Sequence, residues 1–298
     1  MRKEIILPVT AILGGAVGFG LRRWELGTAF EPETGLAIPG MPATYALVGF
    51  TAVMALVLAL LCRGSHQDFP GGYDQAFAAK GNTVYITALV AAALLCAAGG
   101  AVTLLGVPGA FELAGTGPEI SGSPYLTVLP RALLGVFALW AAMSIFTVGR
   151  NNYKGEGKGK YSSSLLVPSY TCCFWLIVAY QARSGDPVVL EYVWQLLAIM
   201  AAVLGTYFMA GFAFERSKVF RSSYFSLLAV YFILLTLADG HPLWMVLLYA
   251  GFFLYFTASV TALQFNCARP LGPRMRGDGE AADLPDRQHD REGTPDEG

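Results

Sequence analysis

The sequence predicts an all-α integral membrane protein, a bundle of about eight transmembrane helices with both termini in the cytoplasm. Three observations support this fold class. Of the 298 residues, 55% are hydrophobic and only 14% are charged, and the mean hydropathy is +0.51, whereas a soluble domain carries about 25% charged residues. The apolar residues form separate long stretches, and the charged residues collect between these stretches and at the carboxyl end.

Eight apolar stretches are candidate spans. A bilayer core about 30 Å thick requires about 20 mostly apolar residues per helix. The stretches are Ile5–Leu21, Pro42–Cys62, Val84–Leu105, Leu126–Val148, Leu165–Ala182, Val193–Phe214, Tyr224–Ala238 and Pro242–Phe265. None of them contains Asp, Glu, Lys or His, and the alternation expected of an outer-membrane barrel is absent from the sequence. We therefore expect a helical bundle over residues 1–265.

Flanking and internal residues define individual spans. The first apolar run ends at Arg22 and Arg23 with no small-residue cleavage site, which indicates an uncleaved helix rather than a signal peptide. The fifth contains Pro168, which should free a backbone carbonyl that Ser or Thr hydroxyls can satisfy. The seventh is short, and we expect it to include Arg221–Ser223, with the arginine reaching toward the lipid headgroups.

Lysine and arginine collect in alternate connections, and this sets the orientation. Cytoplasmic loops carry an excess of these residues. With the amino terminus taken as cytoplasmic, the outer connections hold only Arg22, Arg23 and Arg183. The cytoplasmic set is Arg2, Lys3, Arg63, Lys80, Arg150, Lys154, Lys158, Lys160, Arg216, Lys218, Arg221, Arg269, Arg274 and Arg276. The sequence therefore predicts a multi-pass protein of a plasma membrane or a bacterial inner membrane.

Residues 266–298 differ in composition from the rest of the chain. These 33 residues contain 13 charged side chains, against 28 in the preceding 265, and almost no large apolar ones. Such a segment cannot bury enough apolar surface to fold by itself. We expect a disordered, charged cytoplasmic tail, and the tail and the basic loops are candidate binding sites for a protein partner.

Sequence motifs for catalysis or metal binding are largely absent. His66, His241 and His289 fall in loops and in the tail, whereas a membrane haem needs ligands within helices. Neither an H-E-x-x-H zinc motif nor a G-x-S-x-G nucleophile elbow occurs. The net charge of −1 gives no basic surface typical of nucleic-acid binders. The sequence thus predicts no metal, no cofactor and no nucleic-acid partner, and it argues against an enzyme.

One charge, Arg131, lies inside a predicted span, roughly 8 Å below the start of its helix. An intramembrane arginine is costly unless it is paired or reaches the headgroups. We hypothesise an outer pocket in which Arg131 meets Glu191, Asp239 or an anionic ligand. The alternative is that Arg131 binds lipid phosphate. The candidate ligand-binding residues at this height are Arg131, Arg22, Arg23, Glu25, Glu191, Gln195, Asp239 and His241.

A second polar patch is expected toward the cytoplasmic side. It combines the hydroxyls around Pro168 with the polar residues in the inner half of the eighth span. Those residues are Tyr255, Thr257, Ser259, Thr261 and Gln264. The patch either lines a cavity within the bilayer or joins helices by hydrogen bonds, and the second interpretation is favoured.

Three functions from different classes fit these observations. The first is a permease-like protein that binds or moves a small or amphipathic molecule, including a lipid. The second is a non-catalytic membrane anchor or scaffold subunit of a larger complex, suggested by the lack of catalytic residues. The third, an intramembrane lipid-modifying enzyme, has the least support because no nucleophile–base pair is visible.

Overall fold

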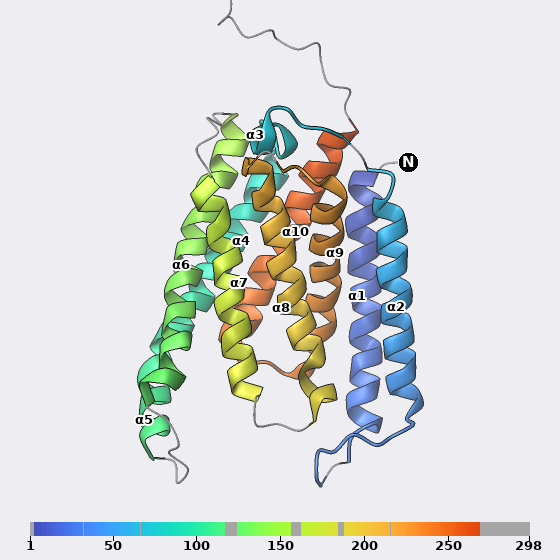
Figure 1. Cartoon of the computed structure of the whole chain (residues 1–298), viewed down its shortest axis with the longest axis vertical. Helices are drawn as coiled ribbons and strands as arrows, with labels where there is room; N and C mark the ends of the chain where they lie inside the picture. Colours follow the sequence, from blue (N-terminus) through green and yellow to red (C-terminus); the bar gives the residue numbers. More distant parts are fainter. Residues whose placement is uncertain are drawn as a thin grey trace, which may run out of the picture. The chain divides into compact units, whose positions relative to one another are not determined.

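The structure is a computed structural model that describes residues 3–31, 33–65, 67–116, 124–155, 162–183, 188–214 and 216–268. Within these ranges the chain forms a helical bundle, and Phe30 and Ala37 form an isolated bridge after the first helix (Figure 1). Eight helices of the described residues are long and apolar enough to cross a membrane. The prediction of a helical bundle with about eight apolar spans is confirmed.

Successive long helices run antiparallel to one another. The elements are α1 (Lys3–Thr28), α2 (Pro42–Cys62), α3 (Gly72–Ala76), α4 (Thr83–Leu105), α5 (Val107–Thr116), α6 (Pro124–Lys154), α7 (Ser162–Arg183), α8 (Val189–Ala210), η1 (Gly211–Phe214), α9 (Val219–Thr236), η2 (Leu237–Asp239) and α10 (Leu243–Cys267). Lys3 lies close to Gly64, directly after α2, and to Cys267 at the end of α10. The beginning of α1 and the end of α10 therefore lie at the same end of the bundle (Figure 1).

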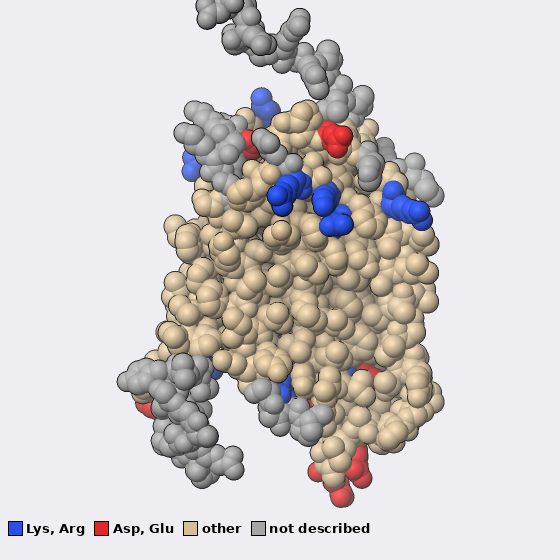
Figure 2. Space-filling model, in the orientation of Figure 1, with Lys and Arg blue, Asp and Glu red and all other residues tan. Residues whose placement is uncertain are grey.

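Most charged side chains of the described residues lie toward the two ends of the bundle. We call the end at which α1 begins the basic end. Its described basic residues are Lys3, Arg63, Lys80, Arg150, Lys154, Arg216, Lys218 and Arg221. Figure 2 shows a broad belt without charged residues between the two ends. Large apolar side chains such as Leu94 and Met143, 66% and 70% exposed, face outward from the bundle, as expected of a surface that contacts lipid.

The first helix is longer than hydropathy predicts. It continues from Leu21 to Thr28, so the start of the connection between the first two spans is helical. Arg22 and Glu25 lie one turn apart on the same face and form a buried ion pair of 2.7 Å, which stabilises this extension. Hydropathy ends the span at Arg22 because it counts a charge as exposed to water, whereas here the charge is paired inside the bundle.

Other boundaries agree with the sequence or shift by a few residues. As predicted, α9 begins before Tyr224 and includes Arg221–Ser223. The final helix continues to Cys267, so Asn266 belongs to α10 rather than to the tail. The amide of Asn266 donates to the carbonyl oxygens of Ala76 and Ala78, both at 2.9 Å, which holds the end of α10 against the α3 segment. The predicted tail from residue 269 onward lies outside the described residues.

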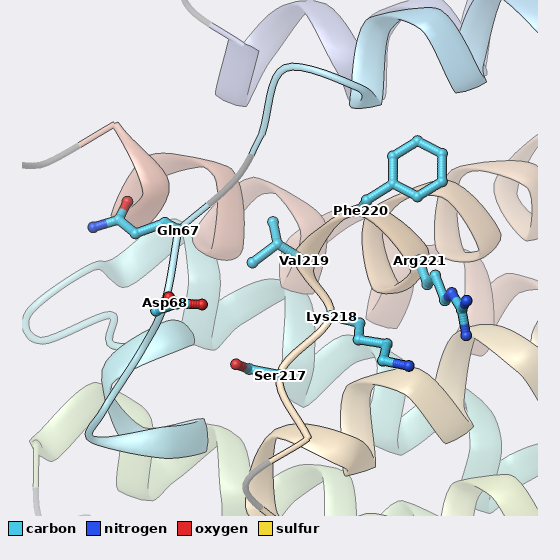
Figure 3. Close-up of a pocket in the computed structure, with 7 residues that line it drawn as sticks. All are labelled: Gln67, Asp68, Ser217, Lys218, Val219, Phe220 and Arg221. Atoms are coloured by element: carbon cyan, nitrogen blue, oxygen red, sulfur yellow. The ribbon is translucent and has the colours of Figure 1, made fainter.

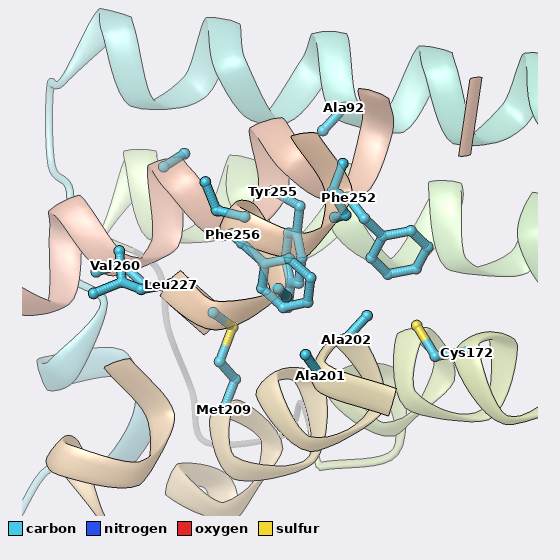
Figure 4. Close-up of a cluster of buried hydrophobic side chains, with 14 of the residues drawn as sticks. Ala92, Cys172, Ala201, Ala202, Met209, Leu227, Phe252, Tyr255, Phe256 and Val260 are labelled. Carbon is cyan, nitrogen blue, oxygen red and sulfur yellow. The ribbon is translucent and has the colours of Figure 1, made fainter. Parts of the chain in front are cut away.

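Helix α10 lies at the centre of the packing. It contacts α4, α9 and α1, and its aromatic side chains fill the interior. Figure 4 shows the rings of Tyr255 and Phe256 pointing from α10 toward α8, where the small side chains of Ala201 and Ala202 leave room. The core is therefore built from large rings on one helix and small residues on the next, which allows dense packing.

Glycines allow α10 to approach α4 closely. A Cβ atom placed on Gly251 would lie 2.6 Å from Sγ of Cys96 and 3.0 Å from the carbonyl oxygen of Ala92. No real side chain tolerates such distances, so the contact requires glycine. Small residues at helix crossings have this role in membrane bundles generally.

We expect Gly251→Leu to lower the free energy of unfolding in detergent by about 1–3 kcal/mol, because the new side chain must displace α4. Gly49→Leu on α2 is the matched control, since a Cβ atom there meets nothing within 4 Å. Thermal unfolding monitored by size-exclusion chromatography measures both. Equal stability of the two variants would contradict the close α4–α10 contact.

Candidate functional site

A buried arginine network occupies the end of the bundle opposite the basic end. Arg22 and Glu25 are both 0% exposed, on the face of α1 that also presents Gly14 and Gly18. These positions are three or four residues apart, so they lie one above another along the helix. The glycines bring α1 close to its neighbours, and Arg22 extends this contact face into the polar end of the bundle.

Two elements besides α1, and the segment directly after α1, surround the guanidinium of Arg22. Its Nη1 donates to Oε2 of Glu25 at 2.7 Å, and its Nε donates to Oδ1 of Asp239 in η2 at 2.6 Å. The carbonyl oxygens of Leu190 and Glu191, in the first turn of α8, accept bonds of 3.2 and 2.7 Å. The ring of Phe30, beyond the end of α1, lies 5.9 Å from the guanidinium carbon. A buried arginine needs such an environment, because unpaired it would carry a large desolvation penalty.

The network continues from Asp239 to His241. The hydroxyl of Thr236 donates to Oδ2 of Asp239 at 2.8 Å and also lies 3.0 Å from Nε2 of His241. The Thr236 hydroxyl thus lies between the carboxylate of Asp239 and the imidazole of His241. Burial lowers the pKa of His241, and the nearby Asp239 carboxylate only partly opposes this effect. His241 is therefore neutral at neutral pH.

The carboxylates outnumber the cation in this network. Glu25 and Asp239 both bind Arg22, and Oε1 of Glu25 has no hydrogen-bond partner among the described residues. The protein groups occupy Nε, Nη1 and Nη2 of Arg22, so the guanidinium already has the acceptors that an anionic ligand would provide. Arg22 therefore links α1 to α8 and η2 through ionic and hydrogen bonds.

The remaining residues of the predicted outer pocket are dispersed. The carboxylate of Glu191 lies 3.6 Å from Arg183, and Nε2 of Gln195 lies 3.4 Å from the sulfur of Met245. Arg23 is exposed beside Arg22. The structure thus brings together four of the eight candidates and adds the main chain of a fifth, Glu191.

Arg131 forms no ion pair with Glu191 or Asp239 in the described part of the chain, where those carboxylates lie beside Arg183 and Arg22. Binding of an anionic ligand by Arg131 stays a prediction. The guanidinium carbon of Arg131 instead lies 5.9 Å from the centre of the Trp244 ring. Its Nε has no hydrogen-bond partner within the described part of the chain. Sequence reasoning treated Arg131 as the buried charge because hydropathy placed Arg22 just outside the first span.

The second polar patch consists of hydrogen bonds within and between helices. Pro168 cannot donate to the carbonyl of Ser164, and the hydroxyl of Ser144 on α6 donates to that oxygen instead. The hydroxyl of Thr171 donates to carbonyl oxygens of α7 and α6, at 2.9 and 3.0 Å. The prediction that a hydroxyl donates to the carbonyl oxygen freed by Pro168 is thereby confirmed. These contacts agree with the interpretation that the patch joins helices by hydrogen bonds.

A groove at the basic end was missed in the sequence. It has a volume of about 570 Å³ and lies where α8 and η1 meet the start of α9. Its polar rim consists of Arg216, Lys218 and Arg221, and aromatic side chains of Tyr207, Phe208 and Phe214 line it. Sequence reasoning counted these cations only as markers of orientation, and no sequence motif places them beside the aromatic residues.

The segment after α8 positions the groove. Phe212 in η1 is buried and packs edge-on against Phe77 at 5.4 Å, which fixes the end of α8. Residues 216–218, before the start of α9, are not helical, and the side chains of Arg216 and Lys218 are exposed there. Arg221 lies over the ring of Phe208 at 5.7 Å. None of the three cations forms an ion pair with the described residues, so they remain available to an anion.

The described residues contain no group of three or more His, Cys, Asp or Glu side chains placed to hold a metal ion. The described cysteines are free; Cys172 is buried and its neighbour Cys173 is exposed.

We expect Arg22→Gln to lower the free energy of unfolding by about 3–5 kcal/mol, because it leaves two carboxylates buried without their cation. Arg23→Gln, which removes the same charge from the next, exposed position, should change stability by less than about 1 kcal/mol. Denaturation in mixed detergent micelles compares the two. A tolerated Arg22→Gln would mean that the network does not hold the helices together.

Folding stability should decrease as the pH falls below about 6.5. The pKa of His241 is lower in the folded protein than in the unfolded chain, so its contribution is complete above about pH 6.5 and is lost as acid favours the unfolded state. His241→Gln should flatten this part of the stability profile. An unchanged profile in the variant would show that other groups cause the loss.

Comparisons with known proteins were made for the whole chain. No protein-family model, no curated protein and no solved structure matches it. The function is therefore inferred from the chemistry of the two polar ends of the bundle.

Proposed function

We propose that the chain is a multi-pass protein of a plasma membrane or bacterial inner membrane that binds a phosphate-bearing amphipathic molecule from the cytoplasmic side. The observation that carries the proposal is the groove at the basic end, where three cations without an ion pair among the described residues border an aromatic surface. Both termini are cytoplasmic in this proposal, since the basic end holds most of the Lys and Arg outside the tail.

The composition of the groove suits an amphipathic anion. A phosphate binds cationic side chains through charge-assisted hydrogen bonds, and Arg216, Lys218 and Arg221 are exposed and available for them. The apolar part of the same molecule would contact Leu166 and the aromatic side chains of the groove, such as Phe208. These two surfaces meet between the charged end and the uncharged belt, which is where the headgroups of a bilayer would lie (Figure 2).

Binding is better supported than movement across the membrane. Between the groove and the Arg22 network lies a packed aromatic interior. In it the ring centroids of Trp175 on α7 and Tyr249 on α10 are 4.6 Å apart, and both side chains are buried. A permease cycle would have to open this packing. The same packing and the Arg22 network favour a second candidate function, which is a rigid membrane anchor that holds a partner protein.

We expect the protein purified in mild detergent to bind phospholipid, and the triple variant Arg216→Gln, Lys218→Gln, Arg221→Gln to lose at least about tenfold in affinity, since each cation near an anionic surface contributes about 1 kcal/mol. Native mass spectrometry with added phospholipid measures the bound fraction.

The matched control is the triple variant Arg63→Gln, Lys80→Gln, Arg150→Gln. It removes three exposed cations from the same end without touching the groove, and it should bind as the unmodified protein does. If both triple variants lost lipid affinity equally, the loss would come from the general charge of this surface and not from the groove. Absence of any bound lipid, with a protein partner co-purifying instead, would favour the anchor.

A further inference from the structure

A second, smaller hollow adjoins the groove, and its charges differ. It has a volume of about 310 Å³ and shares Lys218 and Arg221 with the groove. Its other polar side chains come from Gln67 and Asp68, in the connection between α2 and α3, and from Ser217. We call this hollow the headgroup pocket. It is bordered by both a carboxylate and cations, whereas the charged side chains of the groove itself are all cationic.

The charges of the headgroup pocket are held apart. Asp68 forms no ion pair with the described residues, so neither Lys218 nor Arg221 neutralises it within 4.0 Å. Figure 3 shows the Lys218 and Arg221 side chains reaching toward the same region, while the Asp68 carboxylate and the Ser217 hydroxyl lie on the other side of the segment that carries Lys218. The pocket therefore has a positive side and a negative side.

The position of Asp68 is fixed by its neighbours in the chain. The next residue, Phe69, is buried and lies 6.3 Å from the ring of Phe212. Three residues earlier, the hydroxyl of Ser65 donates to Oε1 of Gln264 on α10 at 2.9 Å, and the amide of Gln264 donates to Ser223 at 2.7 Å. The carboxylate is thus presented by a segment anchored on both sides of it.

We propose that the headgroup pocket selects phospholipids whose phosphate ester carries an ammonium group, as in phosphatidylethanolamine. The inference rests on the proposed function of the groove. Lys218 and Arg221 bind the phosphate, Asp68 binds the ammonium, and the acyl chains follow the aromatic groove. A headgroup with hydroxyls in place of the ammonium, as in phosphatidylglycerol, leaves Asp68 without a cation and brings the phosphate no additional partner.

The test is a competition between short-chain phosphatidylethanolamine and phosphatidylglycerol for the full-length protein in a non-ionic detergent, read as the ratio of the two bound species by native mass spectrometry. The unmodified protein should prefer phosphatidylethanolamine. Asp68→Asn should reduce this preference by about threefold, the size expected for one exposed charge pair, and Asp68→Glu should retain it. Glu4→Gln removes an acid of the basic end that lines neither hollow, and it should leave the ratio unchanged.

The outcomes separate the inference from the function on which it rests. If both lipids bind and Asp68→Asn leaves their ratio unchanged, headgroup selection by Asp68 is overturned and the lipid-binding groove stands. If neither lipid binds the unmodified protein, both fail. Free phosphoethanolamine at the same concentration should not displace the lipid; displacement would overturn the lipid assignment in favour of a soluble phosphate ester.

Discussion

The guanidinium of Arg22 joins parts of the bundle that are far apart in the sequence, and much of the architecture depends on it. Its acceptors come from α1, the first turn of α8 and the η2 turn after α9. A shift of α1 or η2 would separate Arg22 from Asp239, and a shift of α8 would remove two carbonyl acceptors. Loss of partners by a buried charge is far more costly than a lost surface contact. The contact face of α1 depends on the same register, because Gly14, Gly18 and Arg22 lie along one side of that helix.

Arginine has opposite roles at the two ends of the bundle, and the surroundings decide which. Arg22 is buried, and protein oxygens occupy its donors. Arg221 is exposed, lies over the Phe208 ring and has no ion-pair partner among the described residues. An arginine whose donors are taken stabilises structure, whereas one held on an aromatic ring with free donors is suited to bind an anion. This contrast is why the ligand is proposed at the basic end rather than in the predicted outer pocket.

The fold could be predicted from sequence because a bilayer imposes long apolar segments. The role of Pro168 could be predicted for the same reason, since a freed carbonyl in an apolar environment must find a donor. The sequence could not show which of Arg131 and Arg22 is the buried, paired charge, because the free-energy cost of burying a charge depends on its partners. One partner of Arg22 is Asp239, which is 217 residues away in the sequence. The groove was also beyond prediction, since Phe208 and Arg221 come from different helices and only tertiary packing brings them together.

The distances in sequence within the Arg22 network have a consequence for synthesis. Leu190 and Glu191 follow Arg22 by 168 and 169 residues, and Asp239 follows it by 217. At about 5–20 residues per second, a ribosome needs roughly ten to forty seconds to deliver the last of these acceptors. During that interval Glu25 is the one acceptor, among those described, that is made alongside Arg22, because both belong to α1. The Arg22 network can therefore form completely only after α9 and η2 have been synthesised.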